Sequence, residues 1–397
     1  MRRTAARVWK EFVAVAKEPI VVHLPRNLGG NTSMLSDAMR ELGASSISIS
    51  FGDDPYGFQS DIIICTAGDS LLMKEFRRLA WIVRVLRYAD ILHFNSGTTL
   101  AMPSDGTVRM PGKHSVLWRG LRTLHARYTD MLQVLELHIA QLLGRKMYMT
   151  FQGDDLRQGD ESLARFDISI AQHVGLDYYN PNSDQRKRRL LSRYRKHKIR
   201  FFYLNPDLNW FLDGDGTFLP YSNAFGARAT VRGTSPKDRA IRIVHAPSHR
   251  LAKGTATIMN TLSHLQDTGF QFEFEIVENV DNTEAASRIA GADLLIDQLF
   301  AGWYGGVAVE AMAAGVVVMS YIRQQDLAHI PAEMRNELPI VPVDEDTLSA
   351  RIKWFLELSE VERGLLSARS VGFANRWHSP HFVARQLLAD YGVSQEP

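Results

Sequence analysis

Two series of short apolar runs, separated by a polar stretch, constrain the fold of this 397-residue chain more than any other feature. Within each series, runs rich in β-branched residues alternate with segments whose apolar residues recur every three or four positions. Continuously apolar strands that alternate with helices are typical of a parallel sheet covered by helices on both faces. The sequence therefore predicts an α/β protein with two doubly wound domains in tandem.

The apolar runs mark the predicted strands in both halves of the chain. In the first half they are 18–24, 45–51, 61–65, 90–96 and 146–152, and in the second half 241–248, 272–279, 293–300, 316–322 and 339–343. Helical periodicity is clearest in Thr32–Leu42, Leu71–Tyr88 and 116–143.

A polar segment at 227–240, which contains Gly, Pro and Ser, interrupts the alternation and predicts a linker. We therefore place an N-terminal domain at 1–226 and a C-terminal domain at 241–379. Ligands of such sheets bind beyond the carboxyl ends of the strands, so two facing domains predict a ligand cleft between them.

Composition sets limits on the kind of protein. The formal net charge is only +2, so any electrostatic function depends on local clusters of charge. The single cysteine, Cys65, excludes an internal disulfide framework and a cysteine-rich zinc site, and it fits a reducing cytosol. No apolar run approaches the roughly 18 residues needed to span a bilayer. Lys10 and Glu11 interrupt any signal-peptide core, so we expect a cytoplasmic protein.

A glycine-rich turn joins a predicted strand to a helix in DQLFAGWYGGVAVEAMAAG, residues 297–315. Gly305 and Gly306 open that helix, so backbone amides near 304–307 could bind a diphosphate. Glu310, one turn further on, could accept hydrogen bonds from the vicinal hydroxyls of a ribose. The alternative is that the small residues of the helix only permit close packing on the sheet.

A basic turn follows the first strand of the second half, in VHAPSHRLAKGT, residues 244–255. Arg250 can bind a pyrophosphate in bidentate fashion and Lys253 as a point charge, both at a helix N-terminus. No carboxylate lies near these cations in the sequence, which favours an anionic ligand over a solvated basic loop.

Two turns in the first half carry further candidates. Gly29 and Gly30 join a strand to a helix and allow close approach of the backbone to a ligand, or simply form a tight turn. Asp154 and Asp155 follow another strand, where they could hold sugar hydroxyls, bind a metal or act as a general base. They could equally form a salt-bridged loop with Arg157.

Two segments suggest a charged or amphipathic surface. Segment 186–200 has nine Lys or Arg and no acid, which fits a solvated helix face or an anionic membrane surface. Nucleic acid is disfavoured as a partner, because Tyr194 is the only aromatic residue interleaved with these cations. The N-terminal helix, with Trp9 and Phe12 on its apolar side, would pack on its own domain or lie on a membrane.

Together these segments resemble the GT-B glycosyltransferases of the bacterial family 4 type, also called group 1. Residues 297–322 resemble the donor-binding loop and helix of that family, and HAPSHRLAKGT resembles its Arg/Lys phosphate-binding segment. Residues 204–223 resemble the stretch that closes the N-terminal domain. Residues 372–391 resemble the C-terminal helices, the last of which crosses back onto the N-terminal domain.

The resemblance implies the GT-B architecture: two Rossmann-like domains facing across a cleft, with a C-terminal helix at 380–397 returning to the N-terminal domain. It also implies a hexosyltransferase-type glycosyltransferase (EC 2.4) that transfers sugar from a nucleotide-diphosphate donor, UDP-sugar favoured over GDP-sugar. The acceptor would be a glycan or lipid-linked saccharide in bacterial polysaccharide or glycoconjugate assembly. Transfer would retain the anomeric configuration and use neither a metal nor another cofactor.

The resemblance also assigns roles to residues. Arg250 and Lys253 would neutralise the diphosphate. Asp154 or Asp155 could take the base role that Gln152, at the place of the family's common His, cannot fill. The implied donor-binding residues are Gly29, Gly30, Ser248, His249, Arg250, Lys253, Glu278, Trp303, Tyr304, Gly305, Gly306, Val307 and Glu310.

This sequence departs from the family pattern at two positions. The family commonly has an acidic pair spaced E-x7-E, but Gly302 stands where the first acid is expected. The family often has His-Gly where this chain has Gln152-Gly153, and Gln cannot accept a proton. These departures motivate one alternative, a catalytically silent homologue that binds nucleotide sugar or acts as a scaffold. A sugar-nucleotide epimerase on the same two-domain fold is a second alternative.

Overall fold

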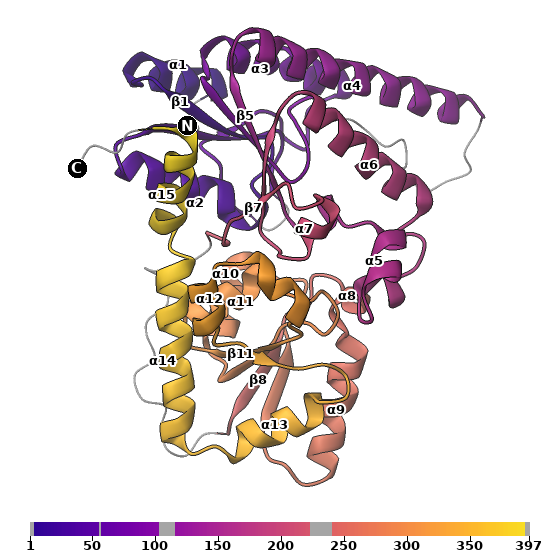
Figure 1. Ribbon diagram of the computed structural model, residues 1–397, viewed down its shortest axis with the longest axis vertical. Helices are drawn as coiled ribbons and strands as arrows, with labels where there is room; N and C mark the ends of the chain where they lie inside the picture. Colours follow the sequence, from indigo (N-terminus) through magenta and orange to yellow (C-terminus); the bar gives the residue numbers. More distant parts are fainter. Residues whose placement is uncertain (1–3, 55–56, 103–115, 223–239, 394–397) are drawn as a thin grey trace.

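The computed structural model describes residues 4–54, 57–102, 116–222 and 240–393. The chain forms two α/β domains, one above the other in Figure 1, each with a parallel sheet between layers of helices. The predicted linker 227–240 lies outside the described residues except for its last residue. The predicted domain boundaries therefore stay a prediction.

The N-terminal sheet has seven strands in the order β3-β2-β1-β4-β5-β6-β7, all paired in parallel. They are β1 (Ile20–Leu24), β2 (Ser45–Ser50), β3 (Ile62–Ile63), β4 (Ile91–Asn95), β5 (Lys146–Phe151), β6 (Arg200–Tyr203) and β7 (Thr217–Phe218). The first five confirm the predicted strands, whereas the sequence patterns missed β6 and β7. The helices are α1 (Ala5–Val15), α2 (Asn31–Glu41), α3 (Leu71–Tyr88), α4 (Val116–Leu142), α5 (Gly159–Arg165), α6 (Pro181–Lys196) and α7 (Leu208–Phe211), with 3-10 turns at η1 (Leu28–Gly30), η2 (Gly153–Asp155) and η3 (Ile170–Gln172).

The C-terminal sheet has five parallel strands in the order β12-β11-β10-β8-β9. They are β8 (Arg242–His245), β9 (Glu273–Ile276), β10 (Leu294–Ile296), β11 (Val317–Ser320) and β12 (Val341–Pro342). The helices are α8 (Arg250–Lys253), α9 (Thr255–Asp267), α10 (Asn282–Ala290), α11 (Gly306–Ala313), α12 (Ala332–Glu337), α13 (Leu348–Glu357), α14 (Glu360–Trp377) and α15 (Pro380–Tyr391), with a 3-10 turn at η4 (Gln324–His329).

The burial of the central strands explains why the apolar runs in the sequence predicted them. Every residue of the central strands β1, β4 and β10 is buried, because helices cover both faces of each sheet. Such strands are mostly apolar on both faces rather than alternating, as the sequence indicated, although β1 and β4 also carry the buried polar residues His23, His93 and Asn95. The predicted two-domain α/β fold is therefore confirmed.

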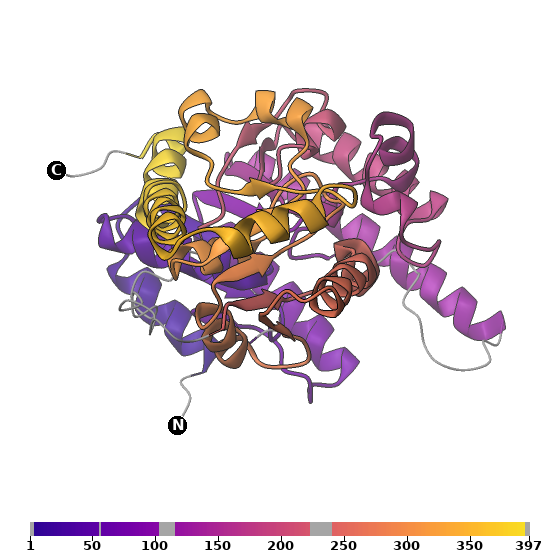
Figure 2. The same ribbon diagram turned by 90° about the horizontal axis from the view of Figure 1, so that it is seen from below.

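The last helix, α15, returns to the N-terminal domain, as the resemblance implied (Figures 1 and 2). It packs against α2, and the Nζ of Lys146 donates a 2.7 Å hydrogen bond to the carbonyl of Tyr391. The fully buried hydroxyl of Tyr391 also bonds Nδ1 of His93, inside the N-terminal sheet. Burial holds the pKa of His93 well below its ordinary value, so the ring is neutral in this contact.

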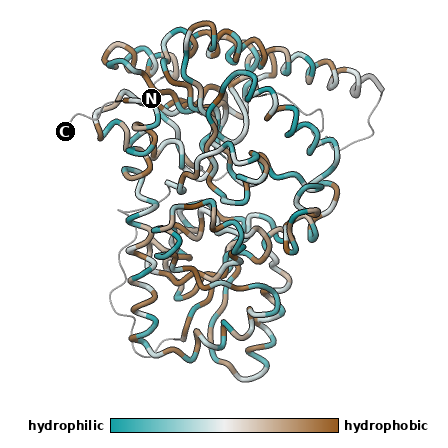
Figure 3. Tube along the Cα trace, viewed as in Figure 1, coloured by the Kyte–Doolittle hydropathy of each residue, from teal (hydrophilic) through white to brown (hydrophobic). Residues whose placement is uncertain are grey.

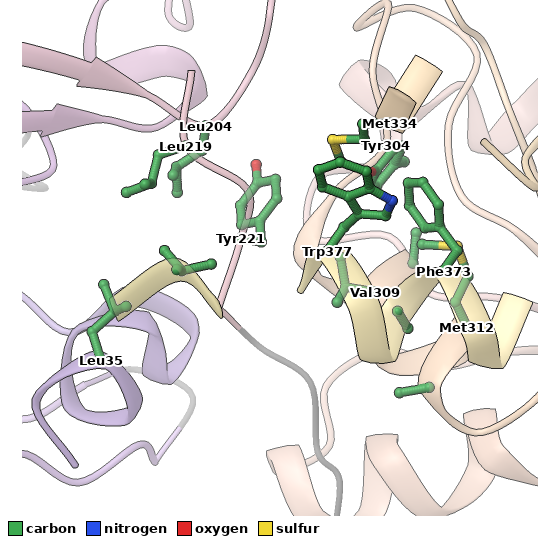
Figure 4. Packing of buried hydrophobic residues seen from close by; sticks show 14 of the residues in the cluster. Leu35, Leu204, Leu219, Tyr221, Tyr304, Val309, Met312, Met334, Phe373 and Trp377 are labelled. Carbon is green, nitrogen blue, oxygen red and sulfur yellow. The ribbon is translucent and has the colours of Figure 1, made fainter. Parts of the chain in front are cut away.

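The two domains share one apolar core. Tyr221, near the end of the N-terminal domain, lies between the side chains of Leu204 and Leu219 and those of the C-terminal domain (Figure 4). The ring of His378 joins the two sides: Nδ1 donates to the Tyr221 carbonyl at 2.8 Å, and Nε2 accepts from the Tyr304 hydroxyl at 2.9 Å. Burial lowers the pKa of His378 to about 4, which keeps the ring in this neutral state.

Four of the nine cations of segment 186–200 form ion pairs with carboxylates elsewhere in the fold. The ion pairs are Arg188 with Asp160, Arg193 with Asp130, Arg195 with Asp213, and Arg200 with Asp390. The apolar side of α1 packs on its own domain, with Trp9 only 3% exposed. The membrane contact expected of these two segments stays a prediction. No helix in the described ranges is long and apolar enough to span a bilayer.

Substitution of Tyr391 tests the docking of α15. Tyr391→Phe removes one buried hydrogen bond and should lower the free energy of unfolding by about 1 kcal/mol. Tyr391→Ala also empties a buried site and should lower it by about 3–5 kcal/mol. Urea unfolding followed by tryptophan fluorescence measures both values. An alanine variant as stable as the parent chain would contradict the docking.

Candidate functional site

The predicted site residues gather at the points where each sheet reverses its winding. In the sheet orders, β1 lies between β2 and β4, and β8 lies between β9 and β10. Open α/β sheets bind ligands beyond the carboxyl ends of the strands at such switch points. Gly29 and Gly30 follow β1, the basic turn 248–253 follows β8, and the glycine turn 302–306 follows β10. The edge-on contact of Tyr178 with His249, with ring centroids 4.8 Å apart, shows that these ends of the two domains meet.

A buried carboxylate that the sequence analysis did not single out organises the C-terminal side. Asp297, directly after β10, is 1% exposed. Its Oδ1 accepts a hydrogen bond from Nζ of Lys253 at 2.5 Å, and its Oδ2 accepts one from the backbone N–H of Gly305 at 2.7 Å. Asp297 therefore fixes the basic turn against the glycine turn. Its position at the end of a buried apolar strand was the signal that could have identified it.

The two predicted phosphate-binding cations are both paired, and this corrects the prediction that no carboxylate is available to them. Lys253 pairs with Asp297, and its side chain is 14% exposed. Arg250 pairs with Glu278 through both carboxylate oxygens. The partners are distant in sequence and close in space because β9 and β10 flank β8. The Arg250 side chain is 53% exposed, so solvent weakens its pair and an anionic ligand could exchange with Glu278.

The glycine turn directs backbone donors toward these cations. Gly305 caps α11, and its N–H is already bonded to Asp297. The N–H groups of Gly306 and Val307 have no acceptor within the described ranges, as expected for the first turn of a helix. Trp303 and Tyr304 contribute backbone only, because both side chains are buried in the core. Lys253 and two free amides therefore lie at one helix N-terminus, an arrangement suited to an anion.

Glu310 is a carboxylate without a visible partner. No hydrogen bond or ion pair of its side chain occurs within the part of the chain that the structure describes, although the residue is half-buried. Burial raises its pKa to about 7. An unpaired, desolvated carboxylate costs folding free energy, so close packing of α11 alone does not explain its presence.

The structure leaves no room for an acidic side chain at Gly302, the position where the family commonly has one. Gly302 has φ of +81°, and an added Cβ would lie 2.4 Å from a guanidinium nitrogen of Arg323. The guanidinium of Arg323 fills this space; it pairs with the buried Asp326 at 2.7 Å and stacks on Phe166 at 3.8 Å. A cation thus occupies the place where the family commonly has a carboxylate.

The two aspartates on the N-terminal side differ in environment. Both oxygens of Asp154 accept hydrogen bonds, from the hydroxyls of Tyr178 and Tyr179. Burial opposes its ionisation, but Arg157 and these hydroxyls hold its pKa below the ordinary value. Asp155 accepts one bond, from the Gln152 N–H at 3.0 Å, and burial raises its pKa to about 7. Asp154 is thus an anchor for the 178–179 segment, and Asp155 is the freer of the two carboxyls.

The remaining predicted residues have local roles. Gly29 and Gly30 have φ of 64° and 72°, and a Cβ on Gly30 would lie 2.5 Å from Phe58, so this tight turn requires glycine. Nδ1 of His249 accepts the N–H of Ala252 and caps α8. Ser248 is exposed beside it.

Because the guanidinium of Arg323 lies so close to Gly302, adding a methyl group at this position should lower the stability of the fold strongly. Gly302→Ala places a side chain in left-handed backbone against a buried arginine, and should lower the free energy of unfolding by ~2–4 kcal/mol. Gly364→Ala is the matched control, because an added Cβ in α14 meets no atom within 4 Å. The control should gain ~0.5–1 kcal/mol. Urea unfolding measures both, and equal stabilities would refute the geometry at Gly302.

The raised pKa of Glu310 predicts that replacing this residue stabilises the fold by an amount that depends on pH. Its pKa rises from 4.5 to about 7 on folding, so the native state loses stability as pH increases between these values. Glu310→Gln removes that loss and should stabilise the chain by ~1–3 kcal/mol above pH 7, with little difference below pH 4.5. Thermal unfolding at several pH values checks this. The exposed Glu357→Gln serves as control, and a gain independent of pH would contradict the interpretation.

Comparisons with known proteins agree with the fold. No protein-family model matches the sequence, and no curated protein matches it. Among solved structures, sucrose-phosphate synthase from Thermosynechococcus elongatus is similar with a TM-score of 0.53 and 13% identity, over 95% of this chain and 98% of that one. A glycosyltransferase from Rickettsia africae ESF-5 is similar with a TM-score of 0.53 and 12% identity, over 94% of this chain and 97% of that one. At such identities the likeness concerns the fold alone: this chain has the two-domain GT-B fold.

Proposed function

We propose that this protein is a retaining, metal-independent glycosyltransferase that uses a nucleotide-diphosphate sugar as donor. One observation carries the proposal: Asp297 holds Lys253 beside the free amides of Gly306 and Val307, and the half-exposed Arg250 belongs to the same turn as Lys253. Cations and helix N-terminal amides that converge in this way suit the diphosphate of such a donor. The family resemblance of the same two segments supports this reading.

The residues would act mainly by position and charge. Lys253 and Arg250 would stabilise the negative charge that develops on the departing diphosphate. Glu310 would accept hydrogen bonds from the ribose hydroxyls, which would offset the cost of its burial. Gly29 and Gly30 would approach the donor from the N-terminal domain, where Asp155 would contact the acceptor.

The finer features of the proposal come from the resemblance. They are a UDP-sugar rather than a GDP-sugar, transfer of a hexose, and a glycan or lipid-linked acceptor in bacterial polysaccharide or glycoconjugate assembly in the cytoplasm. A thermal-shift screen with UDP, GDP and CMP tests the base. A nucleotide at about 100 times its dissociation constant should stabilise the fold by about 2.7 kcal/mol.

Removal of the cations tests the site itself. Arg250→Ala and Lys253→Ala should each lower nucleotide release from the donor at least about 100-fold, because each removes charge from the leaving diphosphate. Lys253→Met with Asp297→Asn is a companion variant that leaves no buried charge unpaired. Arg288→Ala is the matched control: Arg288 is an exposed cation of the same domain whose partners are Glu275 and Glu284. Full activity of both Ala variants would show that the site lies elsewhere.

Two alternatives give different outcomes in the same assays. Gly302 and Gln152 motivate a catalytically silent homologue, which would bind nucleotide without turnover across a broad panel of donors and acceptors. A sugar-nucleotide epimerase would form product without any acceptor. Release of nucleotide only in the presence of an acceptor supports the transferase.

A further inference from the structure

A cavity of about 560 Å³ lies between the two domains, beyond the carboxyl ends of β11 and β12. Segments 321–325 and 342–344, together with the start of α13, form its wall on the C-terminal domain. Arg165 and Asp167, at the end of α5, form its wall on the N-terminal domain, and Figure 1 shows α5 at the boundary of the two domains. Its volume is that of small-molecule sites, which often lie between domains. We refer to it as the edge cavity, because β12 is the edge strand of its sheet.

The edge cavity is a neighbour of the candidate donor site but not a part of it. In the sheet order, β8 and β10 precede the turns of the donor site, whereas β11 and β12 lie beyond β10. Arg323 lines the edge cavity, and its guanidinium also fills the space in front of Gly302 in the glycine turn. Neither Arg250 nor Lys253 lines the cavity. The two sites therefore share a border at Arg323 and differ in their side chains.

The edge cavity begins where the apolar strands end. Figure 3 shows the strands inside the C-terminal domain in brown, the colour of hydrophobic residues. Beyond them the side chains that line the cavity are mainly polar, and the apolar Ile322 and Val343 among its residues are buried. An apolar ligand would leave these polar groups without water or a partner, at a cost in free energy. The lining therefore suits a polar ligand.

The charges of the edge cavity nearly cancel. Arg165 pairs with Glu161, and the buried Arg323 pairs with Asp326. The charged residues that remain in the lining are one cation and two acids: Arg351, Asp167 and Asp344. An anion would meet no excess of cations here, in contrast to the basic turn after β8. The polar ligand that fits this lining is therefore uncharged.

Several polar groups of the cavity are available to such a ligand. The side chains of Asp167, Gln325 and Arg351 form no hydrogen bond or ion pair within the part of the chain that the structure describes. Asp167 offers acceptors only, Arg351 donors only, and Gln325 both. Vicinal hydroxyls of a sugar donate and accept at once, so they can use all three. The half-exposed ring of Tyr321 adds an aromatic surface for the apolar face of a sugar ring.

We propose that the edge cavity is a second carbohydrate-binding site, which holds an uncharged saccharide between the two domains. A peptide or a nucleobase fits less well, because the cavity offers little apolar surface beyond Tyr321 and Pro342. Saccharide binding does not itself require transfer. Its use in the reaction rests on the proposed function: the cavity holds sugars of the acceptor glycan that are remote from the reacting hydroxyl, on the other side of Arg323 from the donor.

Saturation-transfer NMR on the full chain tests the binding with neutral trisaccharides: maltotriose, cellotriose, mannotriose and N-acetylchitotriose. At least one of them should bind. Trigalacturonate, which carries a carboxylate on each sugar, should bind at least about tenfold more weakly than the best neutral sugar, because Asp167 and Asp344 repel it. No binding of any neutral sugar, or tighter binding of trigalacturonate, overturns the proposal.

Paired variants assign the binding to the edge cavity. Asp167→Ala with Arg351→Ala removes an available group from each wall and should weaken saccharide binding at least about tenfold, because hydrogen bonds to charged groups are lost. Both side chains are exposed, so the fold should stay intact. Asp267→Ala with Arg369→Ala removes the same charges from exposed positions of α9 and α14 and should leave binding unchanged. Full binding in the cavity variant, or an equal loss in the control, overturns the assignment.

Nucleotide binding separates this inference from the proposed function. The cavity variant should keep the thermal shift that UDP or GDP produces in the parent chain, whereas Arg250→Ala should reduce that shift and keep saccharide binding. A chain that binds saccharide in the cavity but never releases nucleotide from a donor would refute the transferase alone. Transferase turnover without saccharide binding would refute the edge cavity alone. Loss of saccharide binding in Asp155→Asn, together with full binding in the cavity variant, would place the sugar beyond β5 and overturn the proposal.

Discussion

The buried carboxylate of Asp297 holds the C-terminal side of the candidate site in one arrangement. It lies at the end of the central strand β10 and accepts bonds from Lys253 and from the Gly305 amide. Without it, the basic turn after β8 and the glycine turn after β10 would be two unconnected loops. A buried charge is tolerated only when it is paired and hydrogen-bonded, so Asp297, Lys253 and Gly305 stabilise one another. Glu310 follows in α11, one helical turn beyond Gly306.

A second buried charge shapes the neighbouring part of the interface. Arg323 fills the space in front of Gly302, pairs with Asp326 and donates to the carbonyl of Ile168 in the N-terminal domain. The same guanidinium therefore excludes a side chain at position 302 and joins the two domains. This gives a physical reason for the glycine that the family resemblance left unexplained: the left-handed backbone and the arginine leave no volume for an acid.

Charge pairing separates the basic surfaces of this molecule into two kinds. Segment 186–200 resembled a binding surface because it contains no acid, yet the fold supplies carboxylates from other elements to four of its nine cations. The cations on α3 look unremarkable in sequence, because they are interspersed with apolar residues of a regular helix. Two of them, Arg77 and Arg78, pair with Asp69 and Glu75. Lys74, Arg84 and Arg87 have no acidic partner within the described ranges. A count of charges along the chain does not distinguish these cases.

Sequence alone determined the two α/β domains, ten of the strands, and the glycine and basic turns that follow β1, β8 and β10. These features depend on local periodicity and on the backbone needs of a few residues, which neighbours in the chain specify. Only the tertiary structure decided which charges are neutralised, since Glu278 and Asp297 lie 28 and 44 residues from their partners. It likewise decided that α3 is apolar on both sides but covered on one. Contacts of this kind depend on the order in which the strands assemble, and local pattern carries no information about that order.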